Sequence, residues 1–160
     1  MHTAYISLGS NKGNTVENIK QATNYMNDSA VRVLDSSSIY RTEPQGRKDV
    51  PWYCNAVLAI QTTYNPQELL QYTMHIESLL GRERTGIIHE PRTIDIDILL
   101  YDDILIQTDN LTIPHRHMCE RAFVLIPLQE VAPDILIHGK TIMHYLHMLS
   151  YTIEDDIIWQ

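Results

Sequence analysis

The chain has 160 residues, of which 44% are hydrophobic, and its formal net charge at pH 7 is −8. This length and this apolar fraction fit one domain with an ordinary core, so we expect a single domain over residues 1–160. The negative charge argues against a nucleic-acid partner held by general electrostatics. Any anionic ligand must therefore be held by a local group of cations.

No apolar run is long enough to span a bilayer, and residues 1–3 lead directly into a strand-like segment rather than a signal peptide. We therefore expect a cytoplasmic protein with no membrane partner. Cys54 and Cys119 are too few for a disulfide framework and lack the spacing of a metal-binding pair. We interpret both as reduced packing residues.

The first two thirds of the chain predict an alternation of strands and helices. Asn14 with Glu17, and Asn65 with Glu68, have the spacing of helix capping boxes, and Gly81 is suited to end the second helix. The residues 9–11 (GSN) are interpreted as a strand-to-helix turn. The expected elements are a strand at 3–8, a helix from 14 to about 27, strands at 31–41 and 53–63, a helix from 65 to 81 and a strand at 93–101.

This order of strand, helix, strand, strand, helix and strand predicts an α+β fold with a ferredoxin-like βαββαβ core. The rest of the chain predicts helical and hairpin additions at the C-terminal side. These are a turn at 102–103 that forms a hairpin into 104–107, a loop at 111–117, a helix at 120–131 that is broken or kinked at Pro127, and a short helix at 141–149. The tail, 151–160, is acidic and then apolar, and gives no functional prediction.

The strand at 93–101 alternates aspartates with apolar residues. Because successive side chains on a strand point to opposite faces, residues 94, 96, 98 and 100 are expected on one face and Asp95 and Asp97 on the other. The two aspartates are separated by roughly 6.5–7 Å along the strand. Carboxylates at this separation can hold one hard cation or a pair of cations.

Three arginines, Arg82, Arg84 and Arg92, precede this strand. Guanidinium groups suit phosphate oxygens, so arginines beside metal-binding carboxylates indicate polyphosphate chemistry. Two structural alternatives remain open. An edge strand with one solvated face has the same alternation, and the arginines could be ion-pair partners of the aspartates.

Residues 91–99 (PRTIDIDIL) resemble the signature of the 6-hydroxymethyl-7,8-dihydropterin pyrophosphokinases, a family of folate-biosynthesis enzymes. Further segments extend the resemblance, in the same order, from residue 4 to about residue 135: 6–11, 40–44, 53–56, 76–77, 81–84, 111–115 and 121–128. The resemblance implies that the β,γ-diphosphate of ATP is transferred to the hydroxymethyl group of the dihydropterin, with release of AMP.

The resemblance also implies the site. Asp95 and Asp97 would hold two Mg²⁺ ions, and Arg82 and Arg92 would grip the phosphates, so these four residues are the expected catalytic set. The implied nucleotide-binding residues are Leu70, Glu77, Arg82, Arg84, Arg92, Ile98, Thr112, His115, Arg116 and Arg121. The implied pterin-binding residues are Thr42, Pro44, Gln45, Tyr53, Asn55 and Phe123, with the two aromatic rings on either side of the pterin and the asparagine amide reading its edge.

The chain departs from the family pattern at several positions. His89 and Glu90 stand where the family usually has an aromatic and a small residue, and Ile88 stands where the residue is often basic. Met74 and Asn110 stand where side chains often help to hold the nucleotide. We expect His89 and Glu90 to alter substrate affinity or loop closure. Met74 and Asn110 weaken the resemblance on the adenine side more than at the metal site.

Residue patterns leave the general base and the exact function class open. We hypothesise that a metal-bound substrate hydroxyl attacks while Asp97 or a water accepts the proton. A binding module for pterin or nucleotide and a two-metal hydrolase are the alternatives to the enzyme. Zinc is not expected, because no carboxylate or cysteine completes either histidine pair, 115 with 117 or 144 with 147. ATP and the dihydropterin are the expected partners, and we expect a monomer while leaving a dimer open.

Overall fold

The computed structural model describes residues 1–43, 49, 51–81 and 91–160. The first elements along the chain are β1 (His2–Ser10), α1 (Thr15–Tyr25), β2 (Val31–Ser36), β3 (Tyr40–Thr42), β4 (Tyr53–Thr62), α2 (Pro66–Leu79) and β5 (Asp95–Tyr101). The later elements are β6 (Ile106–Gln107), β7 (Thr112–Ile113), the 3-10 helix η1 (Met118–Glu120), α3 (Ala122–Val131), β8 (Leu136–Ile137), β9 (Lys140–Thr141), α4 (Ile142–Leu146), β10 (Thr152–Glu154) and β11 (Ile157–Trp159).

A seven-stranded sheet forms the centre of the fold, with the order β10-β11-β3-β4-β1-β5 and with β2 also paired to β4. β1 lies between β4 and β5 and is antiparallel to both. If β2 and β3 are counted together as the second strand of the core, the strand order is 2-3-1-4, as in ferredoxin-like folds. The predicted α+β fold with a βαββαβ core is confirmed.

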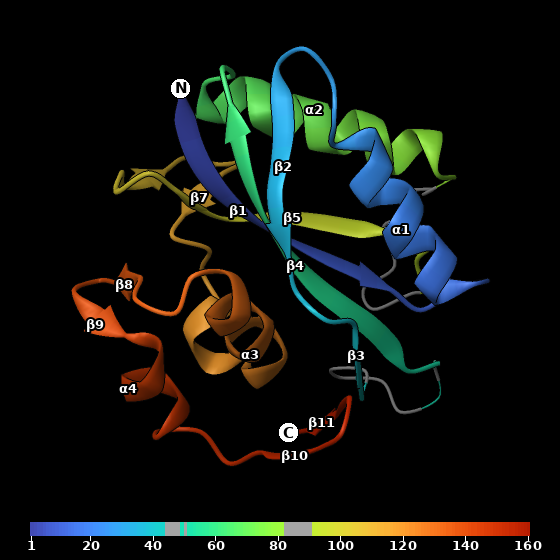
Figure 1. Cartoon of the computed structure of the whole chain (residues 1–160), viewed down its shortest axis with the longest axis vertical. Helices are drawn as coiled ribbons and strands as arrows, with labels where there is room; N and C mark the ends of the chain where they lie inside the picture. The colour runs from blue at the N-terminus through green and yellow to red at the C-terminus, as the bar shows by residue number, and fades with distance from the viewer. Residues whose placement is uncertain (44–48, 50, 82–90) are drawn as a thin grey trace.

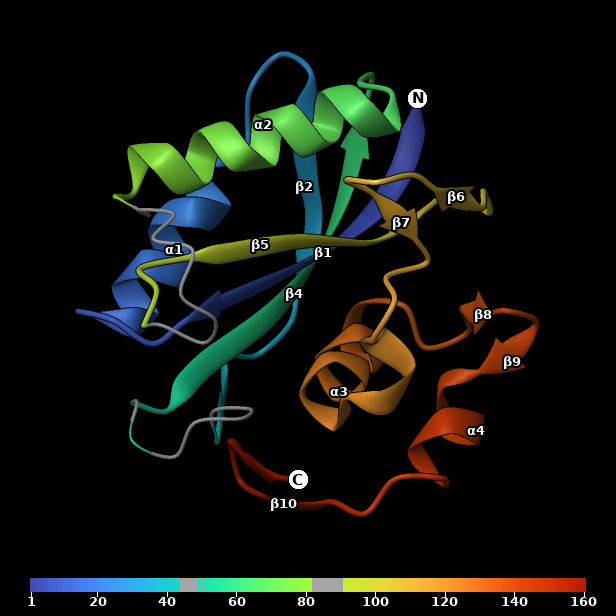
Figure 2. The ribbon, with the colours of Figure 1, turned by 180° about the vertical axis from the view of Figure 1, so that it is seen from behind.

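Helices cover both faces of this sheet (Figure 1). α1 and α2 contribute Ile19 and Ile76 to one buried cluster, whereas α3 and α4 contribute Leu125 and Leu146 to a second cluster on the opposite face. Figure 2 shows the same division from behind, with α1 and α2 on one side of the strands and α3 and α4 on the other. Below, these faces are called the α1/α2 face and the α3 face.

The helix starts were predicted correctly. The Asn14 side chain accepts a hydrogen bond from the Glu17 N–H, and Asn65 and Glu68 form both halves of the capping box that begins α2. Both cysteines are free thiols, as predicted, with Cys54 buried and Cys119 half-buried. Among the described residues, every helix is too short or too polar to traverse a bilayer.

The prediction of one continuous strand over 31–41 is wrong, because this segment is divided into the two strands β2 and β3. Between them, the Ser37 side chain accepts the N–H of Val57, which replaces a backbone partner in the sheet. The Ser38 N–H leaves the sheet altogether and donates to the Glu130 carboxylate on α3 at 2.6 Å. Hydrogen bonds to partners 20 and 92 residues away in sequence therefore compete with the ladder at this point.

The predicted alternation along β5 holds from 94 to 98 but is wrong at Leu100. Tyr5 is paired with Leu100 and Ile6 with Ile98, so Leu99 is an extra residue in β5. This bulge moves Leu100 to the α3 face together with Leu99, whereas Ile96 and Ile98 stay on the α1/α2 face. The bulge begins after Asp97 and leaves the two aspartates on one face.

Three other expectations need correction. The predicted turn at residues 9 and 10 is strand, because β1 stays in register with β4 through Ser10. The hairpin expected at 104–107 does not pair with β5: β6 pairs with β7, so part of the predicted loop at 111–117 is a strand. α3 continues through the buried Pro127 without the expected break, because its residues on both sides of the proline, such as Leu125 and Leu128, pack into the α3-face cluster.

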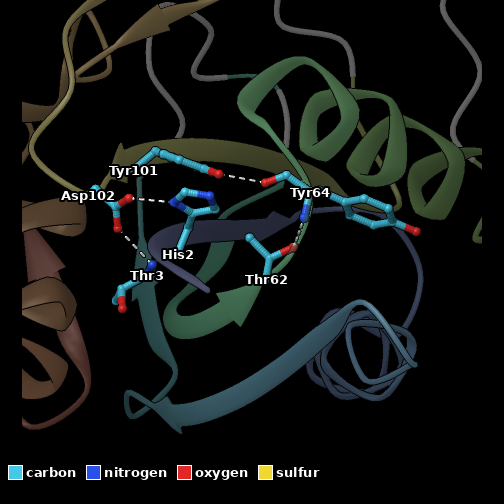
Figure 3. Close-up of polar contacts among 6 residues, drawn as sticks. All are labelled: His2, Thr3, Thr62, Tyr64, Tyr101 and Asp102. Carbon is cyan, nitrogen blue, oxygen red and sulfur yellow. Dashed lines mark hydrogen bonds and ion pairs between the residues drawn. The ribbon is translucent and has the colours of Figure 1, made fainter.

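A polar network ties the ends of β1, β4 and β5 together, at the opposite end of these strands from Asp95 (Figure 3). The Asp102 carboxylate accepts the Thr3 N–H at 2.9 Å and lies 2.7 Å from Nδ1 of His2. The Tyr101 hydroxyl donates to the Tyr64 carbonyl at 2.6 Å. The network holds the three strands in one register.

We predict that Asp102→Ala lowers the free energy of unfolding by about 2 kcal/mol, because it removes the acceptor for Thr3 and places alanine at a positive φ. Asp102 has φ 45°, a conformation that asparagine tolerates. Asp102→Asn, which keeps one acceptor oxygen, should therefore cost less. Urea denaturation measures both variants, and an unchanged free energy for Asp102→Ala would contradict the role of this network.

The same carboxylate gives a pH prediction. Desolvation raises the pKa of Asp102, but the hydrogen bonds from Thr3 and His2 together lower it by more. The pKa of Asp102 in the folded protein therefore lies below its ordinary value of 3.8. The stabilisation is thus complete above pH 3.8 and is lost as the pH falls through the lower pKa of the folded protein. The difference in melting temperature between the unchanged chain and Asp102→Asn should shrink below pH 3.8.

Candidate active site

The residues predicted to bind pterin and metal meet in one row across three neighbouring strands. Gly9 of β1 is paired with Asn55 of β4 on one side and with Asp95 of β5 on the other. Directly paired residues point to the same face, so Asn55, Gly9 and Asp95 all face the α3 side of the sheet. Since neighbouring strands are about 4.8 Å apart, the Cα atoms of Asn55 and Asp95 are separated by roughly 10 Å.

Gly9 lies between the amide and the carboxylate and forms the floor of this row. A methyl group at this position would lie 3.1 Å from Oδ1 of Asn55 and 3.5 Å from Cδ1 of Tyr53. The first distance is tighter than an ordinary van der Waals contact. A glycine inside a strand often marks such a close approach, and here it lets the Tyr53 and Asn55 side chains lie close over the backbone of β1.

The Asn55 amide is held by β3. Its Nδ2 donates to the Thr42 hydroxyl at 2.7 Å, and both side chains are buried. Because Thr42 is paired with Tyr53, three of the predicted pterin residues come from two adjacent strands. The hydrogen bond to Thr42 orients the amide so that Oδ1 faces Gly9.

Arg92 is fixed beside the aspartates by Asn11, a residue that is 1% exposed. The Asn11 side chain accepts the Arg92 N–H at 2.8 Å, and the Asn11 N–H donates to the Arg92 carbonyl at 3.0 Å. Nη1 of Arg92 then lies 3.2 Å from Oδ2 of Asp95. This pair agrees with the alternative that the arginines are ion-pair partners, and it also brings a guanidinium group to the aspartate face.

Glu77 holds the backbone of β5 between the two aspartates. Its side chain is 3% exposed, and Oε2 accepts the N–H of Ile96 at 2.9 Å. Among the described residues β5 is the edge strand of the sheet, so none of the described strands pairs with its outer side, and α2 supplies the acceptor for this N–H instead. Glu77, predicted on the nucleotide side, therefore also positions the strand that carries Asp95 and Asp97.

His115 reaches the aspartate face from the segment after β7. Its N–H donates to the Leu99 carbonyl, and its Nδ1 accepts the His117 N–H at 3.1 Å, which places the ring proton on Nε2. Nε2 lies 3.9 Å from Oδ2 of Asp97. Burial, and next the charge of Arg121, lower the pKa of His115 to about 4, so the ring is neutral at pH 7.

Arg121 and Phe123 flank the start of α3. Arg121 occupies the residue position directly before the helix, and its guanidinium carbon lies 5.8 Å from the centre of the Phe123 ring. Phe123 is partly buried against the α3-face cluster, so part of its surface is accessible. Both residues come from the helix that covers the same sheet face as Asn55 and Asp95.

The other predicted site residues are not shown to lie beside the aspartates. Leu70 and Ile98 pack into the cluster on the α1/α2 face, so their side chains point away from the aspartates. Thr112 lies in β7 and Arg116 is exposed one residue after His115. The predicted residues Pro44, Gln45, Arg82 and Arg84, and the family departures at 88–90, lie outside the described residues.

Sequence reasoning missed Gly9 as a floor residue and Asn11 as the residue that fixes Arg92. A glycine directly after the apolar strand residue Leu8 was a usable signal for Gly9, since a glycine in a strand indicates a close approach to it. Nothing in the local sequence indicates the Asn11 contact, because its partner is 81 residues away.

The aspartates fit magnesium. Asp95 and Asp97 present carboxylates on one face, and the Asp97 side chain is 39% exposed. Within 1–43, 49, 51–81 and 91–160, no group of three or more histidine, cysteine or acidic residues gathers to hold a metal. Magnesium is commonly held by one or two carboxylates while water and substrate phosphates complete its octahedron. The carboxylate pair suits this mode of binding.

Comparison with known proteins identifies the family. The family model described as 7,8-dihydro-6-hydroxymethylpterin-pyrophosphokinase matches residues 5–133. A Methylorubrum extorquens protein named 2-amino-4-hydroxy-6-hydroxymethyldihydropteridine pyrophosphokinase is 41% identical over 151 residues, covering 94% of this chain and 95% of that protein. A Bacillus subtilis protein of the same name is 44% identical over 133 residues, covering 82% of this chain and 79% of that protein. The chain belongs to the 7,8-dihydro-6-hydroxymethylpterin-pyrophosphokinase family.

Some relatives are longer. An Arabidopsis thaliana protein named folate synthesis bifunctional protein is 41% identical over 145 residues. The aligned region covers 91% of this chain but 30% of that protein. The structure of Plasmodium falciparum HPPK-DHPS with pteroate has a TM-score of 0.72 and 16% sequence identity, over 92% of this chain and 42% of that chain. This likeness supports the fold.

We predict that Glu77→Leu lowers the free energy of unfolding by about 2 kcal/mol and speeds hydrogen exchange at the Ile96 N–H, because that buried donor loses its acceptor. Glu77→Gln is the matched control, since it keeps a side-chain oxygen at the same position. Denaturation and NMR-detected exchange measure both effects. Unchanged protection of Ile96 in Glu77→Leu would show that the carboxylate does not hold β5.

Proposed function

We propose that this pyrophosphokinase transfers diphosphate from ATP to 6-hydroxymethyl-7,8-dihydropterin across the row formed by Asn55, Gly9 and Asp95. The observation that carries the proposal is the register of β1, which presents an amide, a glycine and a carboxylate on one face. The amide can pair with the heterocycle of the pterin, and the carboxylate can hold a metal for the phosphates of ATP. This arrangement suits two substrates that must react with each other. The reaction is the one that defines the family, and it serves folate biosynthesis.

The pterin is proposed to lie over Gly9. The accessible side of the Tyr53 ring and the ring of Phe123 provide the flat surfaces, which suit an aromatic heterocycle. Asn55, oriented by Thr42, reads the donor and acceptor edge of the ring. Pro44 and Gln45 belong to the same proposed pocket and lie outside the described residues.

ATP is proposed to bind beside β5, with its phosphates at the aspartates. Arg92 and Arg121, with Arg82 and Arg84 from outside the described residues, neutralise phosphate charge, and Arg116 adds a further contact. His115 is neutral and carries its proton on Nε2, so it can donate to a phosphate oxygen without a charge of its own. Leu70, Glu77, Ile98 and Thr112 complete the proposed nucleotide side at the β5 edge of the sheet.

Asp95 and Asp97 are proposed to hold two magnesium ions, which when bound supply positive charge to the phosphate oxygens. The hydroxymethyl oxygen attacks the β-phosphorus of ATP, the bond from that phosphorus to the α,β-bridging oxygen breaks, and AMP leaves. Asp97 or a water accepts the hydroxyl proton. The chain's own residues align the reactants, because phosphoryl transfer depends on an in-line arrangement.

The remaining expectations stay predictions. All of the proposed residues come from one chain, so the proposal requires no second copy, and we propose a monomer. A single domain over residues 1–160 and a cytoplasmic location are likewise predictions from the sequence.

The reaction itself is tested by measuring AMP formation from ATP with and without the dihydropterin. The proposal predicts AMP only when the pterin is present. AMP formation without pterin would indicate a hydrolase, and pterin or nucleotide binding without AMP would indicate a binding module. Either result would contradict the proposal.

We predict that Asp97→Asn reduces kcat at least about a hundredfold, because it removes a carboxylate charge from the proposed magnesium site. The fold should remain intact, as measured by circular dichroism and thermal unfolding. Asp35→Asn is the matched control, because Asp35 is exposed on β2. Retained turnover of Asp97→Asn with magnesium would remove Asp97 from the mechanism.

Gly9→Ala tests the floor of the proposed pterin pocket. The added methyl group presses on Asn55 and Tyr53, so we predict that the KM for the pterin rises roughly tenfold while the KM for ATP changes little. Steady-state kinetics with each substrate varied separately measures the difference, and the KM for ATP serves as the internal control. Equal changes in both KM values would contradict a pterin-specific floor.

A further inference from the structure

The last nine residues form a hairpin that reaches two parts of the proposed pterin pocket. β10 pairs with β11, and β11 pairs in parallel with β3, with Ile158 opposite Thr42. Both ribbon views show this segment passing below α3 to reach β3 (Figures 1 and 2). The family match ends at residue 133, so the hairpin lies beyond the segment that carries the family pattern.

On its first side, the hairpin covers β3. The Arg41 N–H donates to the Asp156 carbonyl at 2.7 Å, and Ile158 is buried in the α3-face cluster. β3 has three residues, and β11 gives it a second neighbour in addition to β4. Thr42 at the end of β3 orients the Asn55 amide. By pairing with β3, the hairpin therefore helps to keep the hydrogen bond between Thr42 and Asn55 in place.

On its second side, the hairpin caps α3. Oε1 of Gln160 accepts the Ala122 N–H at 2.7 Å, and Nε2 of Gln160 donates to the Glu120 carbonyl at 2.7 Å. The residue at the cap position of α3, Arg121, makes no side-chain capping bond, so the first N–H of the helix is satisfied from 38 residues away. The two contacts bracket Arg121 and fix the backbone immediately before Phe123.

We propose that residues 152–160 are a positioning element for the pterin pocket and that Gln160 is the residue that sets the place of Phe123. The inference rests on the proposed function, in which Phe123 and Asn55 contact the pterin. The hairpin then holds both walls at once, β3 with its amide and the start of α3 with its ring. Loss of the Gln160 bonds should loosen the start of α3 and weaken pterin binding.

Tryptophan fluorescence provides a test of whether the hairpin stays in place. The chain has two tryptophans, and they contact each other edge to face, with the Trp52 and Trp159 ring centres 4.9 Å apart. Their emission therefore reports the docking of β11 against the segment before β4. Loss of the hydrogen bonds and loss of the whole hairpin can thus be distinguished in one sample.

The experiment measures the Kd of 6-hydroxymethyl-7,8-dihydropterin in the presence of magnesium and α,β-methylene ATP, whose α,β bridge cannot be cleaved. Gln160→Met keeps the shape of the side chain and removes both hydrogen bonds. We expect its Kd for the pterin to rise roughly three- to tenfold, with unchanged tryptophan emission and a smaller change in the Kd of the ATP analogue. Gln160→Glu keeps an acceptor for Ala122 and should give an intermediate Kd.

Gln21→Met is the matched control, because Gln21 is exposed on α1 at the other face of the sheet, and its Kd should equal that of the unchanged chain. An unchanged pterin Kd in Gln160→Met would overturn this inference alone. Equal weakening of pterin and ATP-analogue binding, or equal weakening in Gln21→Met, would also overturn it. If the unchanged chain binds no pterin, the proposed function fails and this inference fails with it.

Discussion

The pairing of β1 with β4 and β5 is the constraint on which the site depends. One strand sets two registers at once, so a single residue, Gly9, determines which amide lies opposite which carboxylate. A shift of either partner by one residue would turn Asn55 or Asp95 to the other face. The network around Asp102 fixes this register at the far end of the strands, and Asn11 fixes it beside the aspartates.

Electrostatics explains how an acidic chain can hold an anionic substrate. The net charge of −8 opposes binding at long range, so the favourable charges must be local. Arg92 is brought to the aspartate face by buried backbone contacts, while His115 stays neutral and adds no charge. Magnesium on the aspartates would offset their own repulsion of phosphate, which is why the proposed site needs both carboxylates and arginines.

Patterns with a local physical cause were predictable from the sequence. The helix caps at Asn14 and Asn65 and the common face of Asp95 and Asp97 depend on residues a few positions apart. The bulge at Leu99, the split between β2 and β3 and the capping of α3 by Gln160 depend on partners far along the chain. The roles of the individual site residues came from the family resemblance, and residue patterns alone left them open.

The most direct measurement is a crystal structure of the chain with magnesium, α,β-methylene ATP and 6-hydroxymethyl-7,8-dihydropterin. We expect the pterin over Gly9 with its edge on Asn55, and the metal on Asp95 and Asp97, all on the α3 face. The pterin and the metal should then be bridged by the phosphate chain across the roughly 10 Å that two strand spacings provide. A pterin or a metal bound on the α1/α2 face, or a pterin that does not contact Asn55, would contradict it.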